Sequence, residues 1–186
     1  RAALNCMATL TRAFADLWGW EDALAGVSMA GRTDLAIVSG VIESRMRPRP
    51  AAEEMPLVLA ELREAYLSLL ERQLGETPAV PCPGVPGLLD RIPGIAGMAP
   101  GLATGNFEAG AALKLRSACL DPARFPYGAF GDSCPTRPGM VALAVDAARR
   151  HAGCDVVPVV LGDTPLDLEA ARACGAWAAL VATGSF

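Results

Sequence analysis

The first part of the chain carries apolar side chains at the three- and four-residue spacing of amphipathic helices. One such pattern runs from Leu4 to Trp18 and is ended by a glycine. A second runs from Leu35 to Met46, after two residues that favour a helix start and before two prolines. The clearest stripe runs from Met55 to Leu70. Three helices of this size can bury their stripes against one another, which predicts a small all-helical unit over residues 1–78.

The pattern changes after this unit. Residues 79–87 are dense in proline and glycine and are typical of a linker. Over residues 88–186, short apolar runs alternate with helical stretches, which indicates an α/β domain with a Rossmann-like parallel sheet covered on both faces. Ligands in such folds bind at the carboxyl ends of the strands. We expect strands at Gly101–Thr104, Tyr127–Phe130, Val156–Leu161 and Ala178–Ala182, and helices at Gly87–Ile92, Glu108–Leu120, Gly139–Ala152 and Leu166–Cys174.

Composition narrows the classes of function. Hydrophobic residues make up 52% of the chain and charged residues 19%, which is typical of a folded globular protein. The net charge of −4 and the lack of a basic stripe argue against a nucleic-acid partner. No apolar run reaches the ~18–20 residues needed to cross a membrane. Six scattered cysteines and one histidine do not match the spacing of a zinc site, so we expect reduced thiols in a cytoplasmic protein.

The strongest chemical signal is the segment Gly162–Asp167. A buried strand ends at a glycine, and two carboxylates, Asp163 and Asp167, follow four residues apart. Asp163 stands at the strand tip, where a hard cation with oxygen ligands can be held. Asp167 has a second interpretation, since Thr164 can cap the following helix and Asp167 can complete a capping box. Both interpretations of Asp167 stay open at this stage.

A second polar turn, Thr104-Gly105-Asn106, follows the first predicted strand. A hydroxyl at a strand end, followed by amides near a helix start, is a natural cradle for a phosphate oxygen. The same three residues also serve an ordinary cap and turn. The phosphate interpretation is favoured because the turn falls at the same edge of the sheet as Asp163.

A phosphate site also needs a positive side chain, and two candidates compete. Lys114 is the only lysine beside fifteen arginines. It lies ten residues after Thr104, which at ~1.5 Å rise per residue places it far down the helix from the strand edge. Arg137 precedes Pro138, which starts the next helix at the functional edge, so we favour Arg137 and keep Lys114 as the alternative. Either charge also fits a solvated surface position.

Two further turns are weaker candidates. Between the first two predicted helices, Arg32 and Thr33 can contact an anionic substrate if the helical unit folds over the sheet, and a plain inter-helix turn fits almost as well. The pair Gly131-Asp132 repeats the glycine–aspartate turn, but position 136 is a threonine, so no second carboxylate follows. We interpret this pair as a turn with at most a peripheral role.

Taken in order, these motifs resemble those of a known family. Thr104-Gly105-Asn106, then Arg137-Pro138, then Gly162-Asp163-Thr164-Pro165-Leu166-Asp167, resemble the second, third and fourth motifs of the haloacid dehalogenase-like superfamily. The chain looks most like its phosphoglycolate-phosphatase-like branch, with residues 1–78 matching a helical cap and the remainder the core. The resemblance implies phosphate chemistry, with Asp163 and Asp167 as ligands of a Mg²⁺ cofactor.

One motif of the family is absent. Its aspartate nucleophile and its acid–base aspartate stand in an Asp-x-Asp-x-Thr turn after the first strand, and no Asp-x-Asp occurs anywhere in this sequence. In the family that strand lies centrally, between the strands predicted at Gly101–Thr104 and Val156–Leu161. Without it, those two strands either close on each other or leave an apolar slot. We therefore expect about 15–25 further residues upstream, the length of a strand plus a turn.

The resemblance implies Mg²⁺-dependent hydrolysis of a small phosphorylated metabolite through an aspartyl-phosphate, with residues 1–186 alone inactive. In this scheme Thr104, Arg137 and Asp163 are the catalytic residues present, and Thr104, Gly105, Asn106 and Arg137 bind the phosphate. Two alternatives stay open: a degenerate relative that binds a phosphorylated ligand or a protein without turnover, and a phosphomutase of the same family. The sequence indicates no oligomeric state.

Overall fold

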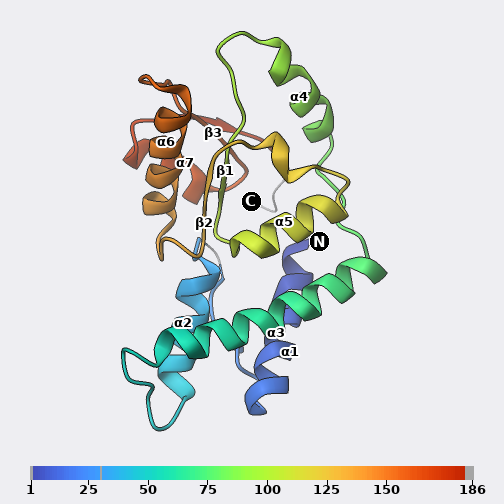
Figure 1. The fold of residues 1–186 in the computed structure, drawn as a ribbon, viewed down its shortest axis with the longest axis vertical. Coiled ribbons are helices and arrows are strands. Elements are labelled where there is room, and N and C mark those ends of the chain that lie inside the picture. Colours follow the sequence, from blue (N-terminus) through green and yellow to red (C-terminus); the bar gives the residue numbers. More distant parts are fainter. Residues whose placement is uncertain (1, 30, 183–186) are drawn as a thin grey trace.

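The computed structural model describes residues 2–29 and 31–182, and within them it is a mixed α/β structure with seven α-helices and four short strands (Figure 1). The helices lie close to the predicted positions, because apolar spacing and capping residues fix them locally. In chain order the elements are α1 (Ala2–Trp18), α2 (Asp34–Arg45), α3 (Met55–Glu76), α4 (Val85–Arg91), β1 (Leu102–Thr104), α5 (Glu108–Ser117), β2 (Gly128–Phe130), α6 (Arg137–Ala152), β3 (Val159–Gly162), α7 (Pro165–Ala173) and β4 (Trp177–Leu180).

Helices α1, α2 and α3 form one layer with its own apolar core (Figure 1). Phe14 of α1, Ile42 of α2 and Tyr66 of α3 are each at most 2% exposed. The predicted stripes therefore face inward. Tyr66 also reaches the ring of Phe107, at a centroid distance of 6.2 Å, just before α5. The helical layer is thus packed directly against the start of α5.

The strands form two separate sheets. β1 pairs in parallel with β2, with Leu102 opposite Gly128, and β3 pairs in parallel with β4, with Val159 opposite Trp177. In the described residues no hydrogen bonds join β1 to β3. The single continuous sheet that the sequence predicts is therefore not formed by this part of the chain. Strands β1 and β3, which were expected to flank a central strand, do not pair with each other.

The β3–β4 sheet is covered on one face. Val160 of β3 packs against Val141 and Val145 of α6 and against Ala170 of α7. On the other face Val159, Leu161 and Trp177 are 58%, 55% and 72% exposed. The expected cover on both faces is not met within the described residues, because α6 and α7 both pack against the side of the sheet that carries Val160.

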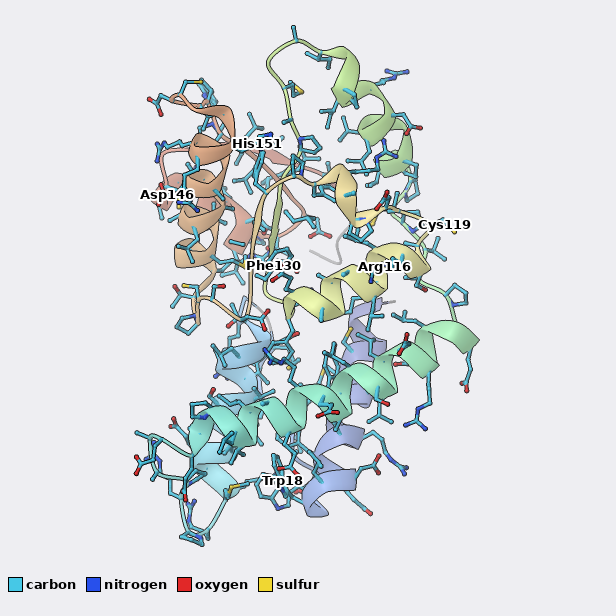
Figure 2. All side chains as sticks on the ribbon, viewed as in Figure 1. Trp18, Arg116, Cys119, Phe130, Asp146 and His151 are labelled. Atoms are coloured by element: carbon cyan, nitrogen blue, oxygen red, sulfur yellow. The ribbon has the colours of Figure 1, made fainter. Side chains whose placement is uncertain are left out.

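Three further observations concern the thiols, the length of the helices and the single histidine. The six cysteines form no disulfide. No helix in the part of the chain that the structure describes has both the length and the apolar character needed to cross a membrane. The single histidine, His151, lies in the last turn of α6 with its ring 5.3 Å from that of Tyr127. Figure 2 shows it well away from Phe130, which marks the carboxyl end of β2.

The helical core gives a direct test of what stabilises the fold. Leu62 and Leu57 both lie on α3 but are 1% and 73% exposed. Leu62→Ala removes buried methyl groups and leaves a cavity, so we expect the free energy of unfolding to fall by about 2–5 kcal/mol. The matched control Leu57→Ala should stay within about 0.5 kcal/mol of the wild type. Urea unfolding followed by circular dichroism measures both, and equal midpoints would contradict the packing described.

Candidate functional site

The turn after β1 is closed by its own side chains. The hydroxyl of Thr104 accepts hydrogen bonds from the backbone N–H of Asn106, at 3.3 Å, and from its side-chain Nδ2, at 2.6 Å. The side-chain oxygen of Asn106 accepts a hydrogen bond from the ammonium of Lys114 on α5. Thr104, Asn106 and Lys114 are all partly buried. The structure therefore brings together two predicted phosphate ligands and the cation that the sequence analysis ranked second.

The argument from helical rise against Lys114 was wrong. Helix α5 begins at Glu108, as the sequence predicted, so Lys114 lies less than two turns into it; the error was to count the helical rise from Thr104 instead of from Glu108. Side chains of a helix also point back toward its N-terminus, and a lysine reaches about one further turn in that direction. The ammonium of Lys114 therefore returns to the turn at the strand end.

The amides at the start of α5 are already paired. The N–H of Phe107 donates to the carboxylate of Asp34, at 3.0 Å, and the N–H of Glu108 donates to that of Asp132, at 2.5 Å. Since the N–H of Asn106 binds Thr104, the amides expected to be available to a phosphate instead bind protein oxygens. The predicted cradle is corrected accordingly: its side chains face the site, but these three amides do not. Asp132, interpreted from sequence as a plain turn residue, caps α5.

A second polar cluster surrounds Asp167, which is 5% exposed. One of its oxygens accepts hydrogen bonds from the N–H of Asp163, at 3.2 Å, and from the N–H and hydroxyl of Thr164, at 3.1 and 2.8 Å. Thr164 also accepts from the N–H of Asp167, which completes the capping box of α7. A Cβ on Gly162 would lie 2.3 Å from that of Asp167, so the strand must end in glycine to admit this carboxylate.

The other oxygen of Asp167 is bound by Arg137. The guanidinium donates to it from Nε, at 2.9 Å, and also from Nη2. Burial alone would raise the pKa of Asp167, but the hydrogen bonds from Thr164 and Arg137 outweigh it and hold that pKa below its usual range. Arg137, predicted as a phosphate ligand, ties the start of α6 to α7, and its charge is largely balanced by the carboxylate.

This geometry tests the predicted metal pair. Both oxygens of Asp167 already accept hydrogen bonds from protein donors, so Asp163 and Asp167 do not together fit Mg²⁺ in this arrangement. Asp163 is exposed at the strand tip. Among residues 2–29 and 31–182 no group of three or more histidine, cysteine, aspartate and glutamate side chains is placed to hold a metal ion. The capping-box interpretation of Asp167 is the one that the structure supports.

The predicted substrate contacts on the helical unit point elsewhere. The guanidinium of Arg32 donates to the carbonyl of Ala36 on α2, at 2.8 Å. Thr33 is 1% exposed and caps α2, because its hydroxyl accepts from the N–H of Ala36. Only the backbone of this segment reaches the site: a Cβ on Gly105 would lie 2.9 Å from the carbonyl oxygen of Arg32. In this arrangement both side chains bond to the start of α2, which is the plain inter-helix turn that the sequence analysis kept as the alternative.

Asp34 is a site residue that the sequence reasoning missed. Its N–H donates to the carbonyl of Gly105, at 2.7 Å, while its carboxylate accepts from Phe107. Burial raises the pKa of this carboxyl, the hydrogen bond from Phe107 and the charge of Lys114 lower it, and Asp132 raises it further; the net shift is upward. The residue was interpreted as a helix-start signal, and nothing local in the sequence indicated that the start of α2 would lie against the Thr104–Asn106 turn.

The comparisons with known proteins bear on the fold. No family model matches this chain, and no curated protein matches it. Among solved structures, CbbY from Rhodobacter sphaeroides in complex with phosphate superposes with a TM-score of 0.68 at 21% sequence identity, covering 96% of this chain and 79% of that one. The two chains thus share a fold.

The raised pKa of Asp34 predicts a pH-dependent effect of Asp34→Asn. A carboxyl whose pKa is higher in the folded than in the unfolded chain, where it is about 3.9, stabilises the fold at low pH and loses that contribution as the pH rises. The asparagine variant lacks this loss. Relative to the wild type, it should therefore gain stability as the pH rises above about 3.9, the pKa of the unfolded chain, as measured by urea unfolding at each pH.

Asp22→Asn is the matched control for this titration. Asp22 pairs with Arg45 at 2.6 Å, which lowers its pKa. A lowered pKa gives the opposite sign, since the stabilisation is present above about pH 3.9 and disappears below it. Relative to the wild type, this variant should lose stability as the pH rises through the acid range. Parallel pH profiles for Asp34→Asn and the wild type would contradict the assignment for Asp34.

Proposed function

We propose that this chain provides the phosphate-binding edge of a haloacid dehalogenase-like hydrolase that acts on a small phosphate monoester. The observation that carries the proposal is the hydrogen-bonded set of Thr104, Asn106 and Lys114 at the carboxyl end of β1. Parallel α/β folds bind ligands at that end of their strands. The likeness to CbbY, which was solved with phosphate, supports the same class of ligand.

The charge at this edge is supplied locally. The chain carries a net charge of −4, so an anion is not attracted by the protein as a whole. Lys114 places its ammonium beside Asn106, and a partly buried site screens that charge less than water does. Thr104 adds a hydroxyl at the strand tip. Together these groups would bind and orient a phosphoryl group, while Arg137 and Asp167 keep the neighbouring helix starts in register.

The helical layer fits the role of a cap over this edge. Helices α1, α2 and α3 share one core, and the segment after residue 30 contacts the Thr104–Asn106 turn through Asp34. We therefore assign residues 1–78 to a cap that excludes water and selects the substrate, residues 79–87 to a linker, and residues 88–186 to a Rossmann-like core. In this assignment the cap and the core meet at the proposed phosphate site.

Turnover needs groups that this sequence does not contain. Covalent phosphoryl transfer requires a carboxylate in line with phosphorus, and the Asp-x-Asp turn that supplies it in the family is absent from the chain. That turn would also have to provide most of the Mg²⁺ ligands, since Asp163 and Asp167 do not build the site by themselves. Magnesium dependence is thus our prediction only for a protein that carries this turn, and residues 1–186 alone should not hydrolyse esters.

The second candidate is a protein that binds a phosphorylated ligand without turnover. The absence of an Asp-x-Asp turn from this sequence favours it, because binding through Thr104, Asn106 and Lys114 needs no nucleophile. A phosphomutase would need the same missing aspartate as the hydrolase. The three functions share the phosphate site of Thr104, Asn106 and Lys114. The hydrolase and the phosphomutase also need an aspartate nucleophile, and the binding protein does not.

Phosphate binding by residues 1–186 tests the shared site. Isothermal titration with inorganic phosphate should give measurable binding, and Lys114→Met should weaken it about tenfold or more, the effect of losing one charged hydrogen bond. Arg116→Met is the matched control, since Arg116 is exposed on the same helix (Figure 2) and should alter the dissociation constant less than about twofold. Equal losses in the two variants would refute the site.

Turnover separates the hydrolase from the binding protein. A protein that joins these residues to an Asp-x-Asp-x-Thr turn should release phosphate from a panel of small phosphate monoesters in the presence of Mg²⁺, and Asp163→Ala should abolish most of that release. Residues 1–186 assayed in parallel should release none. Hydrolysis by residues 1–186, or full activity in the Asp163→Ala protein, would overturn this assignment, and phosphate binding without release by the joined protein would favour the second candidate.

A further inference from the structure

The side-chain amide of Asn106 lies between Lys114 and Thr104, and its orientation is dictated by chemistry. A lysine ammonium can donate hydrogen bonds but cannot accept them. The amide oxygen must therefore face Lys114, and the amide nitrogen must face the hydroxyl of Thr104, as the structure has it. The opposite orientation would place N–H groups against an ammonium. The ammonium of Lys114 therefore determines that the amide nitrogen of Asn106, and not its oxygen, faces the hydroxyl of Thr104.

This orientation sets the polarity of the Thr104 hydroxyl. The hydroxyl oxygen accepts from Nδ2 of Asn106 at 2.6 Å and from the backbone N–H of the same residue at 3.3 Å. A hydroxyl has two acceptor sites and one hydrogen to donate. With both acceptor sites directed at Asn106, the hydrogen is the group that Thr104 presents to a ligand. A ligand oxygen that can only accept, such as that of a fully ionised phosphate, matches it.

We propose that Lys114 is a positioning residue, which fixes Thr104 through Asn106 as a hydrogen-bond donor toward a bound oxyanion. The inference rests on the proposed function, because the oxyanion is the phosphoryl group of that proposal. It adds a second role to the charge of Lys114. Without the ammonium, the side-chain amide of Asn106 can flip. The hydroxyl of Thr104 can then donate its hydrogen bond to the amide oxygen and not to a ligand.

Asp34 adds a negative charge near this set of hydrogen bonds. Its carboxylate comes from the start of α2 and is itself fixed by the N–H of Phe107 and, through its own N–H, by the carbonyl of Gly105. The positive charge of Lys114 lies close enough to lower the pKa of Asp34, against the larger upward effect of burial. In a partly buried setting such an attraction is stronger than at the surface. The helical layer therefore contacts the Thr104–Asn106 turn through Asp34.

The first test needs no ligand. In ¹⁵N-labelled protein the Asn106 side-chain amide should give two well-separated proton signals with slow solvent exchange, because one proton is held by Thr104. Lys114→Met should move these signals toward those of a solvated asparagine, whereas Lys114→Arg, which can also only donate, should preserve them. An unchanged Asn106 amide in Lys114→Met would overturn the inference, whatever the chain binds.

The second test is a double-mutant cycle with inorganic phosphate that leaves the charge unchanged. Asn106→Leu removes the amide that orients Thr104, so phosphate binding by residues 1–186 should weaken about fivefold, the size of one neutral hydrogen bond. In a Thr104→Val background no hydroxyl is left to orient, so the same change should have little effect. Equal losses in both backgrounds would show that Asn106 acts on phosphate directly and would overturn the inference.

The two tests separate this inference from the function on which it rests. If the wild-type chain binds no phosphate, the phosphate site of the proposed function fails, and the amide signals still decide whether Lys114 orients Asn106. If phosphate binds and the amide signals or the cycle fail, the site stands and Lys114 acts through its charge alone. A backbone amide spectrum of Lys114→Met that matches the wild type away from the site shows that loss of folding does not explain the change at Asn106.

Discussion

The contact between the Gly31–Asp34 segment and the strand ends is the interaction on which the rest of the arrangement depends. The two small sheets exchange no hydrogen bonds in the described residues, so neither positions the other through its backbone. The segment contacts both sides: Asp34 donates to Gly105 after β1, Arg32 forms an antiparallel bridge with Thr136 before α6, and Gly31 lies against Leu166 of α7. A Cβ on Gly31 would lie 2.4 Å from Leu166, and its φ of +69° also favours glycine.

Around this segment the polar groups form two clusters with different purposes. The cluster of Asp167, Thr164 and Arg137 satisfies a buried carboxylate completely, as a buried charge requires, and joins two helix starts. The cluster of Thr104, Asn106 and Lys114 also forms a continuous chain of hydrogen bonds, but it leaves a hydroxyl hydrogen and further ammonium hydrogens for a ligand. The first cluster is structural, and the second is the one that keeps hydrogen-bond donors for a ligand.

Local patterns in the sequence predicted local structure well. Apolar spacing located the helices, and the Thr164–Asp167 pair was recognised as a possible capping box because that signal lies within four residues. Two predictions failed for different reasons. The start of α5 was predicted correctly, but the reach of Lys114 was misjudged because the direction of its side chain was left out. The role of Asp34 depends on α2 meeting the end of β1 across about 70 residues of chain. The single continuous sheet failed because strand pairing is also a long-range property.

The bare face of the β3–β4 sheet has a consequence for how this chain behaves in solution. A two-stranded sheet is marginal in water, and here its outer face presents Val159, Leu161 and Trp177 to solvent. Covering such a surface lowers the free energy of the system. In the described residues the β3–β4 sheet has two strands, so each strand has an edge that can pair with a further strand. Residues 1–186 should therefore self-associate increasingly with concentration and bind dyes that fluoresce on apolar surfaces, so dilute samples are the appropriate state for every titration of this chain.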